Sequence, residues 1–215
     1  MTTLILLRHG RTPANSSGIL AGDSPVALDE VGERQARAAG ERLAGVKFDW
    51  VVSSPLQRCR QTLSLALPGV SPAVEEGLTE CGYGEWAGRS LKDLMGEPMW
   101  PVIQAHPSAA GFPGGETMAA MSARAVAAVR RWNETVGPEG VWLACSHGDI
   151  IKAIVADALG MHLDQFQRIH VAPGSLTVIK YTPFRPFLMR LSDDGPLAVQ
   201  PASTSSDAPV GGGAE

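Results

Sequence analysis

Three nearly continuous apolar runs restrict the fold of this chain more than any other feature: "TLILL" at residues 3–7, "FDWVV" at 48–52 and "VWLAC" at 141–145. Strands that are apolar at almost every position are typical of parallel strands covered on both faces. Helical patterns separate the runs, which is the order expected of βαβ units. We therefore predict an α/β fold, a three-layer α/β/α sandwich with a mostly parallel central sheet.

The element boundaries follow from hydrophobic periodicity and from turn residues. Strands are expected at about 3–8, 48–53, 141–146, 175–182 and 187–191. Helices are expected at about 29–44, 55–67, 88–95, 116–136 and 148–160. In the helix over 55–67, we expect Ser54 to form the cap and Pro55 to take the first helical position.

The chain has 215 residues, of which 44% are hydrophobic and 19% are charged, an ordinary balance for a protein with a sizeable core. We expect one domain over residues 1–194. The segment 96–115 contains Gly and Pro and has little periodicity, so we interpret it as an excursion that could act as a lid. From 195 to 215 Pro, Ser, Ala and Gly predominate, which predicts a disordered tail.

Charge and cysteine content exclude several classes of protein. The formal net charge is −4 at pH 7, so we expect no binding to nucleic acid or to an anionic membrane. The cysteines, Cys59, Cys81 and Cys145, form no CxxC pair, which favours a reducing compartment over a disulfide framework. The apolar run after Met1 is too short for the core of a signal peptide. We therefore expect a cytoplasmic protein.

Each of the three apolar strands ends in polar residues that a plain core would not contain. The first strand ends at Arg8 and His9, and the second leads into a helix with Arg58 on its first turn. The third ends at Ser146 and His147, just before another helix. Because the carboxyl ends of parallel strands share one edge of a sheet, we expect these side chains to meet there.

Two arginines and two histidines at one edge suit a doubly charged anion, above all a phosphate monoester. The N-termini of the following helices add partial positive charge. One neutral imidazole could attack phosphorus while the other donates a hydrogen bond to the transferring group. We expect Gly10 and Gly148, which follow the two histidines, to let the backbone approach the ligand.

Phosphoryl transfer also requires a proton for the leaving oxygen, and a buried carboxyl group could supply it. Glu80 and Glu85 both lie in the Gly-rich stretch "GLTECGYGEWAG", and their spacing alone does not separate them. A metal hydrolase that uses Glu80, His9, His147 and Asp149 as ligands is an alternative. The cation at Arg8 and the lack of an HxH or HExxH spacing argue against it.

Four segments together resemble the histidine phosphatase superfamily, also called the phosphoglycerate mutase-like family. "LLRHGRTPAN" resembles its opening signature, and "SSPLQRCRQT" resembles its second phosphate-binding segment. "LTECGYGEWAG" resembles the segment that carries the acid, and "SHGDII" resembles the one that carries the second histidine. The matches run in the family's order from residue 3 to about 182. One departure is Ser146, where the family often has Gly.

The resemblance implies a phosphoglycerate mutase-like fold and a role for each matching residue. It makes His9 the nucleophile that becomes phosphohistidine and Glu80, rather than Glu85, the proton donor. Phosphoryl binding is implied for a further set of residues: Arg8, Asn15, Arg58, His147 and Gly148. The resemblance implies no metal ion, and we predict no cofactor.

Within the family we favour a phosphatase over a mutase. Mutases carry a longer insertion with a pair of adjacent arginines, whereas residues 89–115 contain only Arg89. Arg130 and Arg131 are adjacent, but we interpret them as part of a solvated helix face. The stretch "FPGGET" at 112–117 resembles the phosphatase branch. A phosphoglycerate mutase and a non-catalytic phosphate-binding module remain the alternatives.

The partner of this chain is expected to be a small-molecule phosphate monoester, and exposed apolar residues on the later strands would suit a homodimer. An apolar cap could hold an apolar or ring-bearing leaving group. Its candidate residues are Met99, Trp100, Val102, Ile103 and Phe112. We favour the simpler interpretation that they pack the excursion onto the domain.

Overall fold

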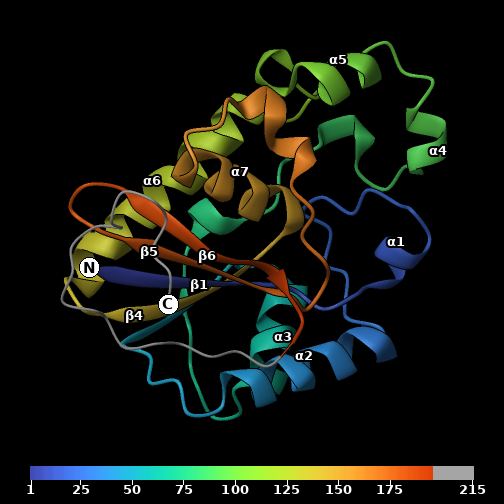
Figure 1. Cartoon of the computed structure of the whole chain (residues 1–215). Coiled ribbons are helices and arrows are strands. Elements are labelled where there is room, and N and C mark those ends of the chain that lie inside the picture. The colour runs from blue at the N-terminus through green and yellow to red at the C-terminus, as the bar shows by residue number, and fades with distance from the viewer. Residues whose placement is uncertain (196–215) are drawn as a thin grey trace.

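The computed structural model describes residues 1–195, which form a six-stranded sheet between two layers of helices (Figure 1). The strands are β1 (Thr2–Arg8), β2 (Trp50–Ser53), β3 (Ala73–Val74), β4 (Val141–Ser146), β5 (Leu176–Tyr181) and β6 (Pro186–Asp193). Their order across the sheet is β3-β2-β4-β1-β5-β6. The predicted α/β sandwich with a mostly parallel sheet is confirmed.

Parallel pairing is confined to the part of the sheet that carries the polar strand ends. β1 pairs with β4, β4 with β2 and β2 with β3, all in parallel, whereas β5 runs antiparallel to both β1 and β6. The register sets Arg8 opposite Ser146. Because β2, β4 and β1 are neighbours and run the same way, the three polar ends lie at one edge.

β1 and β4 are buried on both faces, as their nearly continuous apolar sequences predicted, whereas β2 begins with the exposed Trp50. In β1, Leu4 and Leu6 face one core cluster while Ile5 and Leu7 face the other. The first cluster contains side chains of α6 (Met118–Val136) and α7 (Gly148–Ala158), and the second contains side chains of α2 (Glu30–Leu43) and α3 (Gln57–Ala66). These helix pairs lie on opposite sides of the sheet in Figure 1.

The five predicted helices are present, with shifts at their ends. The helix expected over 88–95 is shorter, α4 (Leu91–Leu94). α3 begins two positions later than predicted, at Gln57, and its first turn has no side-chain cap. The hydroxyl oxygen of Ser54 accepts from the amide of Leu56, at 3.4 Å, but this residue precedes the first turn, and the same hydroxyl group contacts a histidine at the site. None of the helices within residues 1–195 has the length and apolar character that crossing a membrane requires.

Several short elements were not predicted, because each is too short to show periodicity. They are α1 (Pro13–Ser16), strand β3 and, within the excursion, α5 (Trp100–Ala105) and the 3-10 helix η3 (Pro107–Ala109). Three further 3-10 helices are η1 (Glu76–Leu78), η2 (Gly84–Trp86) and η4 (Leu163–Arg168). α1, α4 and α5 lie together beyond the carboxyl end of β1 (Figure 1). The predicted tail lies outside the described residues, apart from Gly195.

The edge strand β6 and its hairpin turn present apolar side chains to solvent. Phe184, Met189 and Leu191 are all exposed. Such residues on an outer strand are compatible with the expected homodimer, which stays a prediction.

Candidate active site

The polar strand ends border one pocket of about 340 Å³ at the carboxyl edge of the sheet. Six of the seven predicted site residues line it: Arg8, His9, Asn15, Arg58, Glu80 and Gly148. The seventh, His147, lies behind the wall of the pocket and is fully buried. The rings of His9 and His147 are adjacent, with their centroids 5.2 Å apart.

His9 is held in one tautomer by the backbone of the next residue. Its Nδ1 lies 2.8 Å from the carbonyl oxygen of Gly10. Because a carbonyl oxygen can only accept, Nδ1 must carry the proton, and Nε2 then holds the lone pair of the neutral ring. Burial lowers the pKa of His9 well below its usual value, and the positive charges of Arg58 and Arg8 lower this pKa further. The ring is therefore neutral near pH 7, as a nucleophile must be.

Gly10 is required by the packing of the chain itself. A Cβ on Gly10 would lie 2.4 Å from the carbonyl oxygen of Gly32, and one on Gly32 would lie 2.0 Å from that of Arg11. The loop after β1 therefore rests directly on the backbone of α2. Similarly, a Cβ on Gly148 would lie 3.3 Å from the guanidinium carbon of Arg8. Both glycines allow close packing within the protein, and the expectation that they also let the backbone approach a ligand stays a prediction.

His147 uses both ring nitrogens inside the protein. Nε of Arg58 donates to its Nδ1 at 3.2 Å, so the ring proton is on Nε2, which lies 2.8 Å from the hydroxyl oxygen of Ser54. Burial lowers the pKa of His147 well below its usual value, with the charge of Arg58 as the next cause. His147 thus contacts Arg58 directly, and the structure gives no direct evidence for the predicted hydrogen bond to the phosphoryl group.

Arg58 is anchored before any ligand arrives. It lies on the first turn of α3, only 2% exposed. Besides His147, its guanidinium donates to the carbonyl oxygens of Gly22, at 2.6 Å, and Ser24, at 3.2 Å. A guanidinium fixed in this way presents positive charge at a constant position, which favours binding of a phosphoryl group.

Arg8 combines an anchored end with an unpaired nitrogen. One terminal nitrogen donates to the carbonyl oxygen of Val171, while Nε is buried and has no partner among the described residues. Burial lowers the pKa of this guanidinium, because the charged form loses hydration. Because Arg8 also lines the pocket, its positive charge can attract a phosphoryl group there.

Glu80 has the properties of an acid at neutral pH. Burial, and then the negative charge of Asp149, raise the pKa of Glu80 to about 7. Its Oε1 accepts from the amide of Cys81 at 3.0 Å, which fixes one carboxyl oxygen. Glu85 is exposed, and it lies against the turn at Gly114 instead of the pocket. The geometry therefore separates the two glutamates that the sequence pattern left equivalent.

Asn15 reaches the pocket from α1, the short helix that was not predicted. A capping box holds it: Oδ1 accepts from the amide and the hydroxyl of Thr12, both at 3.0 Å. With its oxygen occupied, the side chain has its amide N–H groups left as donors for an anion.

The wall of the pocket also contains polar residues that sequence reasoning missed, together with Asp149, which it considered only as a metal ligand. The hydroxyl of Tyr83 donates to Asp149 at 3.0 Å, and Lys152 lies 3.2 Å from Asp149 and from the side-chain oxygen of Gln167. All four residues line the pocket. Tyr83 lies within the acid segment, and Asp149 and Lys152 lie one and four residues after Gly148, so proximity to the motifs was the available signal.

Of the five residues proposed as an apolar cap, only Trp100 lines the pocket, where it stacks on Trp86 with ring centroids 6.5 Å apart. Ile103 and Phe112 are buried in the core, and Met99 and Val102 pack against it. The structure therefore favours the interpretation that this segment mainly packs onto the domain.

The metal-hydrolase alternative would need His9, His147, Glu80 and Asp149 to converge. Within residues 1–195, no group of three His, Cys, Asp or Glu side chains is placed to hold a metal ion. The Asp149 carboxylate is instead engaged by Tyr83 and Lys152. Within the described chain these four side chains therefore do not form a metal-ligand set.

Ser146, the departure from the family pattern, also has a defined place. Its buried hydroxyl group donates to the carbonyl oxygen of Leu78 at 2.8 Å. Leu78 ends the 3-10 helix η1 (Glu76–Leu78), two residues before Glu80. The serine therefore ties the end of β4 to the segment that carries the acid.

Comparisons with known proteins agree with this geometry. A 2,3-bisphosphoglycerate-dependent phosphoglycerate mutase of Brucella melitensis is 28% identical over 91% of this chain and 95% of its own length. The adenosylcobalamin/alpha-ribazole phosphatase of Escherichia coli is 30% identical over 82% and 88%. The crystal structure of the alpha-ribazole phosphatase from Shigella flexneri superposes with a TM-score of 0.83 and 27% identity, covering 92% of this chain and all of the other.

The model of the histidine phosphatase superfamily (branch 1) matches residues 4–194. That span contains all four segments that suggested the family, so the family prediction and the predicted enzyme class are confirmed. The strand ends, the two histidines and this match lead to one conclusion: the chain belongs to the histidine phosphatase superfamily.

Proposed function

We propose that this enzyme is a metal-independent phosphatase that hydrolyses a small-molecule phosphate monoester through a phosphohistidine on His9. The observation that carries the proposal is the fixed tautomer of His9, whose Nε2 lone pair belongs to a ring beside Arg8 and Arg58. Glu80 in the same pocket, with a pKa of about 7, supports its role as the proton donor.

In the first step, Nε2 of His9 attacks phosphorus and the bond from phosphorus to the leaving oxygen breaks. Glu80 gives its proton to that oxygen, so the product leaves as an alcohol. Arg8 and Arg58 balance the charge of the phosphoryl group throughout. The proton on Nδ1 of His9 stays on its hydrogen bond to Gly10.

In the second step, water attacks the phosphohistidine. The Glu80 carboxylate takes a proton from this water as the new P–O bond forms and the P–N bond breaks. Inorganic phosphate leaves, and both His9 and Glu80 return to their starting states. Every proton that Glu80 gives in the first step is therefore recovered in the second.

A phosphoglycerate mutase is the second candidate, because one of the similar proteins is such an enzyme. The distribution of cations favours hydrolysis. The cations lining the pocket in the described chain are Arg8, Arg58 and Lys152. Arg89 pairs with Glu97, and at the surface of α6 Arg130 pairs with Asp157 and Arg131 with Glu75. No pair of adjacent arginines among residues 1–195 lines the pocket to hold a substrate carboxylate.

Phosphate release from p-nitrophenyl phosphate in the presence of a chelator tests the proposal, over about pH 5 to 8 where histidines titrate. Wild type should release phosphate and His9→Ala should not, whereas His170→Ala, an exposed residue outside the pocket, should match wild type. Equal release by wild type and His9→Ala would contradict the proposal. Isomerisation of a phosphoglycerate without free phosphate would favour the mutase, and inactivity on every monoester would favour a binding module.

A further inference from the structure

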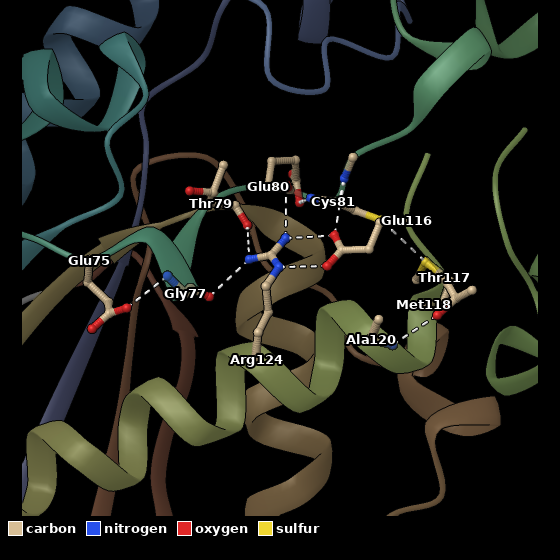
Figure 2. A network of polar contacts seen from close by, with 11 residues as sticks. Glu75, Gly77, Thr79, Glu80, Cys81, Glu116, Thr117, Met118, Ala120 and Arg124 are labelled. Carbon is tan, nitrogen blue, oxygen red and sulfur yellow. Dashed lines mark hydrogen bonds and ion pairs between the residues drawn. The ribbon is translucent and has the colours of Figure 1, made fainter. Parts of the chain in front are cut away.

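Arg124, on α6, is bound to the loop that carries Glu80 (Figure 2). One terminal nitrogen donates to the carbonyl oxygens of Gly77, at 3.0 Å, and Thr79, at 2.6 Å. The other donates to the carbonyl oxygen of Glu80 itself, at 3.1 Å. The guanidinium therefore holds three backbone carbonyls within four successive residues.

Glu116 completes the arrangement from the other side. Its carboxylate binds Arg124 in a two-pronged pair, with Nε at 2.7 Å from Oε1 and the second terminal nitrogen at 2.8 Å from Oε2. Oε2 also accepts from the amide of Gly82 at 3.3 Å. The backbone is thus held at Glu80 and again at Gly82, on both sides of Cys81.

All five N–H donors of Arg124 have an acceptor in this arrangement: two on Glu116 and three on the loop. A lysine carries the same charge but has three donors on one atom, so it cannot bridge a carboxylate and three separate carbonyls. Arginine is therefore needed here for its geometry as well as for its charge.

The orientation of the Glu80 carboxyl group depends on this backbone. Its Oε1 accepts from the amide of Cys81, and Cys81 lies between the two positions that Arg124 and Glu116 hold. A movement of the loop would carry that amide, and the carboxyl group with it, away from the leaving oxygen.

We propose that Arg124 and Glu116 are positioning residues that hold Glu80 where it can protonate the leaving group. This inference rests on the proposed function, in which Glu80 is the proton donor. It predicts a selective loss of rate. When Glu80 is displaced, the rate should fall most for substrates whose leaving oxygen needs a proton. Alkyl phosphates have basic leaving groups and need it, whereas p-nitrophenyl phosphate has a good leaving group and depends on it little.

The experiment compares kcat/KM for an alkyl phosphate and for p-nitrophenyl phosphate. For both substrates this constant reports the transfer of the phosphoryl group to His9. General acid catalysis contributes about 10²–10⁴-fold, so Arg124→Lys should lower the alkyl rate by about 10–100-fold and the p-nitrophenyl rate by less than about 3-fold. Glu116→Gln should act in the same direction. Arg131→Lys, on the same helix with one ion pair to Glu75 at the surface, is the matched control and should leave both rates unchanged.

Glu80→Gln separates a failure of this inference from a failure of the proposed function. If Glu80→Gln lowers both rates equally, Glu80 is not the donor and the proposed function fails. If Glu80→Gln lowers mainly the alkyl rate, whereas Arg124→Lys lowers both rates equally or leaves both unchanged, the positioning role is wrong. The double variant Glu80→Gln/Arg124→Lys should show no more selectivity than Glu80→Gln alone. Should Arg124→Lys fail to fold, Glu116→Gln decides between the same outcomes.

Discussion

Thr62 accepts a hydrogen bond from the amide of Gly10 at 3.0 Å, and its hydroxyl group donates to the carbonyl oxygen of Arg58 at 2.7 Å. One buried hydroxyl group therefore joins the end of β1 to the first turn of α3. Because the carbonyl oxygen of Gly10 orients His9, this contact links the proposed nucleophile, His9, to Arg58.

Thr62→Val should destabilise the fold by about 1–3 kcal/mol, because the amide of Gly10 would be buried without an acceptor. Activity should fall as well, since Gly10, whose carbonyl oxygen orients His9, would be held less firmly. Ser64→Ala, an exposed position on the same helix, is the control and should change stability by less than about 0.5 kcal/mol. Urea unfolding measures both effects, and equal midpoints for the two variants would contradict the assigned role of Thr62.

Gly32→Ala should be destabilising although Gly32 lies in a helix. Alanine at a helical position is ordinarily better than glycine by about 1 kcal/mol. Here the added Cβ would lie 2.0 Å from the carbonyl oxygen of Arg11, so we expect a net loss of about 1–3 kcal/mol from overpacking. Gly96→Ala meets no contact closer than 3.5 Å and should be nearly neutral. Thermal unfolding of the two variants tests this, and a more stable Gly32→Ala would show that the close approach is absent.

The rate should fall as the pH rises above about 7, because Glu80 must carry a proton to act as the acid. Its pKa is raised above the usual value, so the group is protonated below about 7 and loses the proton above it. Asp149→Asn removes a negative charge that raises this pKa, so the decline should begin at lower pH. The measurement is kcat/KM for an alkyl phosphate against pH. A decline that persists unchanged in Glu80→Gln would assign it to another group.

Trp100→Ala should raise KM for a monoester with a bulky aromatic leaving group by about 2–10-fold, the effect of losing one aromatic contact. KM for a small alkyl phosphate should hardly change, because such a substrate has no ring to contact Trp100 in the pocket wall. Steady-state kinetics on the two substrates are sufficient. An equal change in both KM values would mean that Trp100 only supports the packing of the excursion.

Much of this site could be predicted from the sequence, because it is built at strand ends. An apolar run that stops at His9 or at His147 marks both a strand and its end, and parallel neighbours bring such ends to one edge. Glu80 could not be distinguished from Glu85 in this way. Both lie in the same Gly-rich loop, and only the folded chain buries one beside Asp149 and leaves the other exposed.

Contacts between side chains that are far apart along the chain could not be predicted from the sequence. Ser54 has the pattern of a helix cap, but its hydroxyl group contacts His147, which lies 93 positions away. Arg124 lies in an alanine-rich helix and gives no sign that it holds a loop 44 to 47 positions earlier. Local patterns report local preferences, and these contacts are made by the tertiary fold.

The proposed phosphohistidine on His9 is tested most directly by trapping the phosphorylated enzyme. Wild type is mixed with a radiolabelled phosphate monoester and quenched in alkali, where phosphohistidine survives, and the labelled peptide is then identified. In wild type the label should be on the peptide that contains His9, and His9→Gln should carry no label. Label on the His147 peptide, or full turnover by His9→Gln, would contradict the proposal.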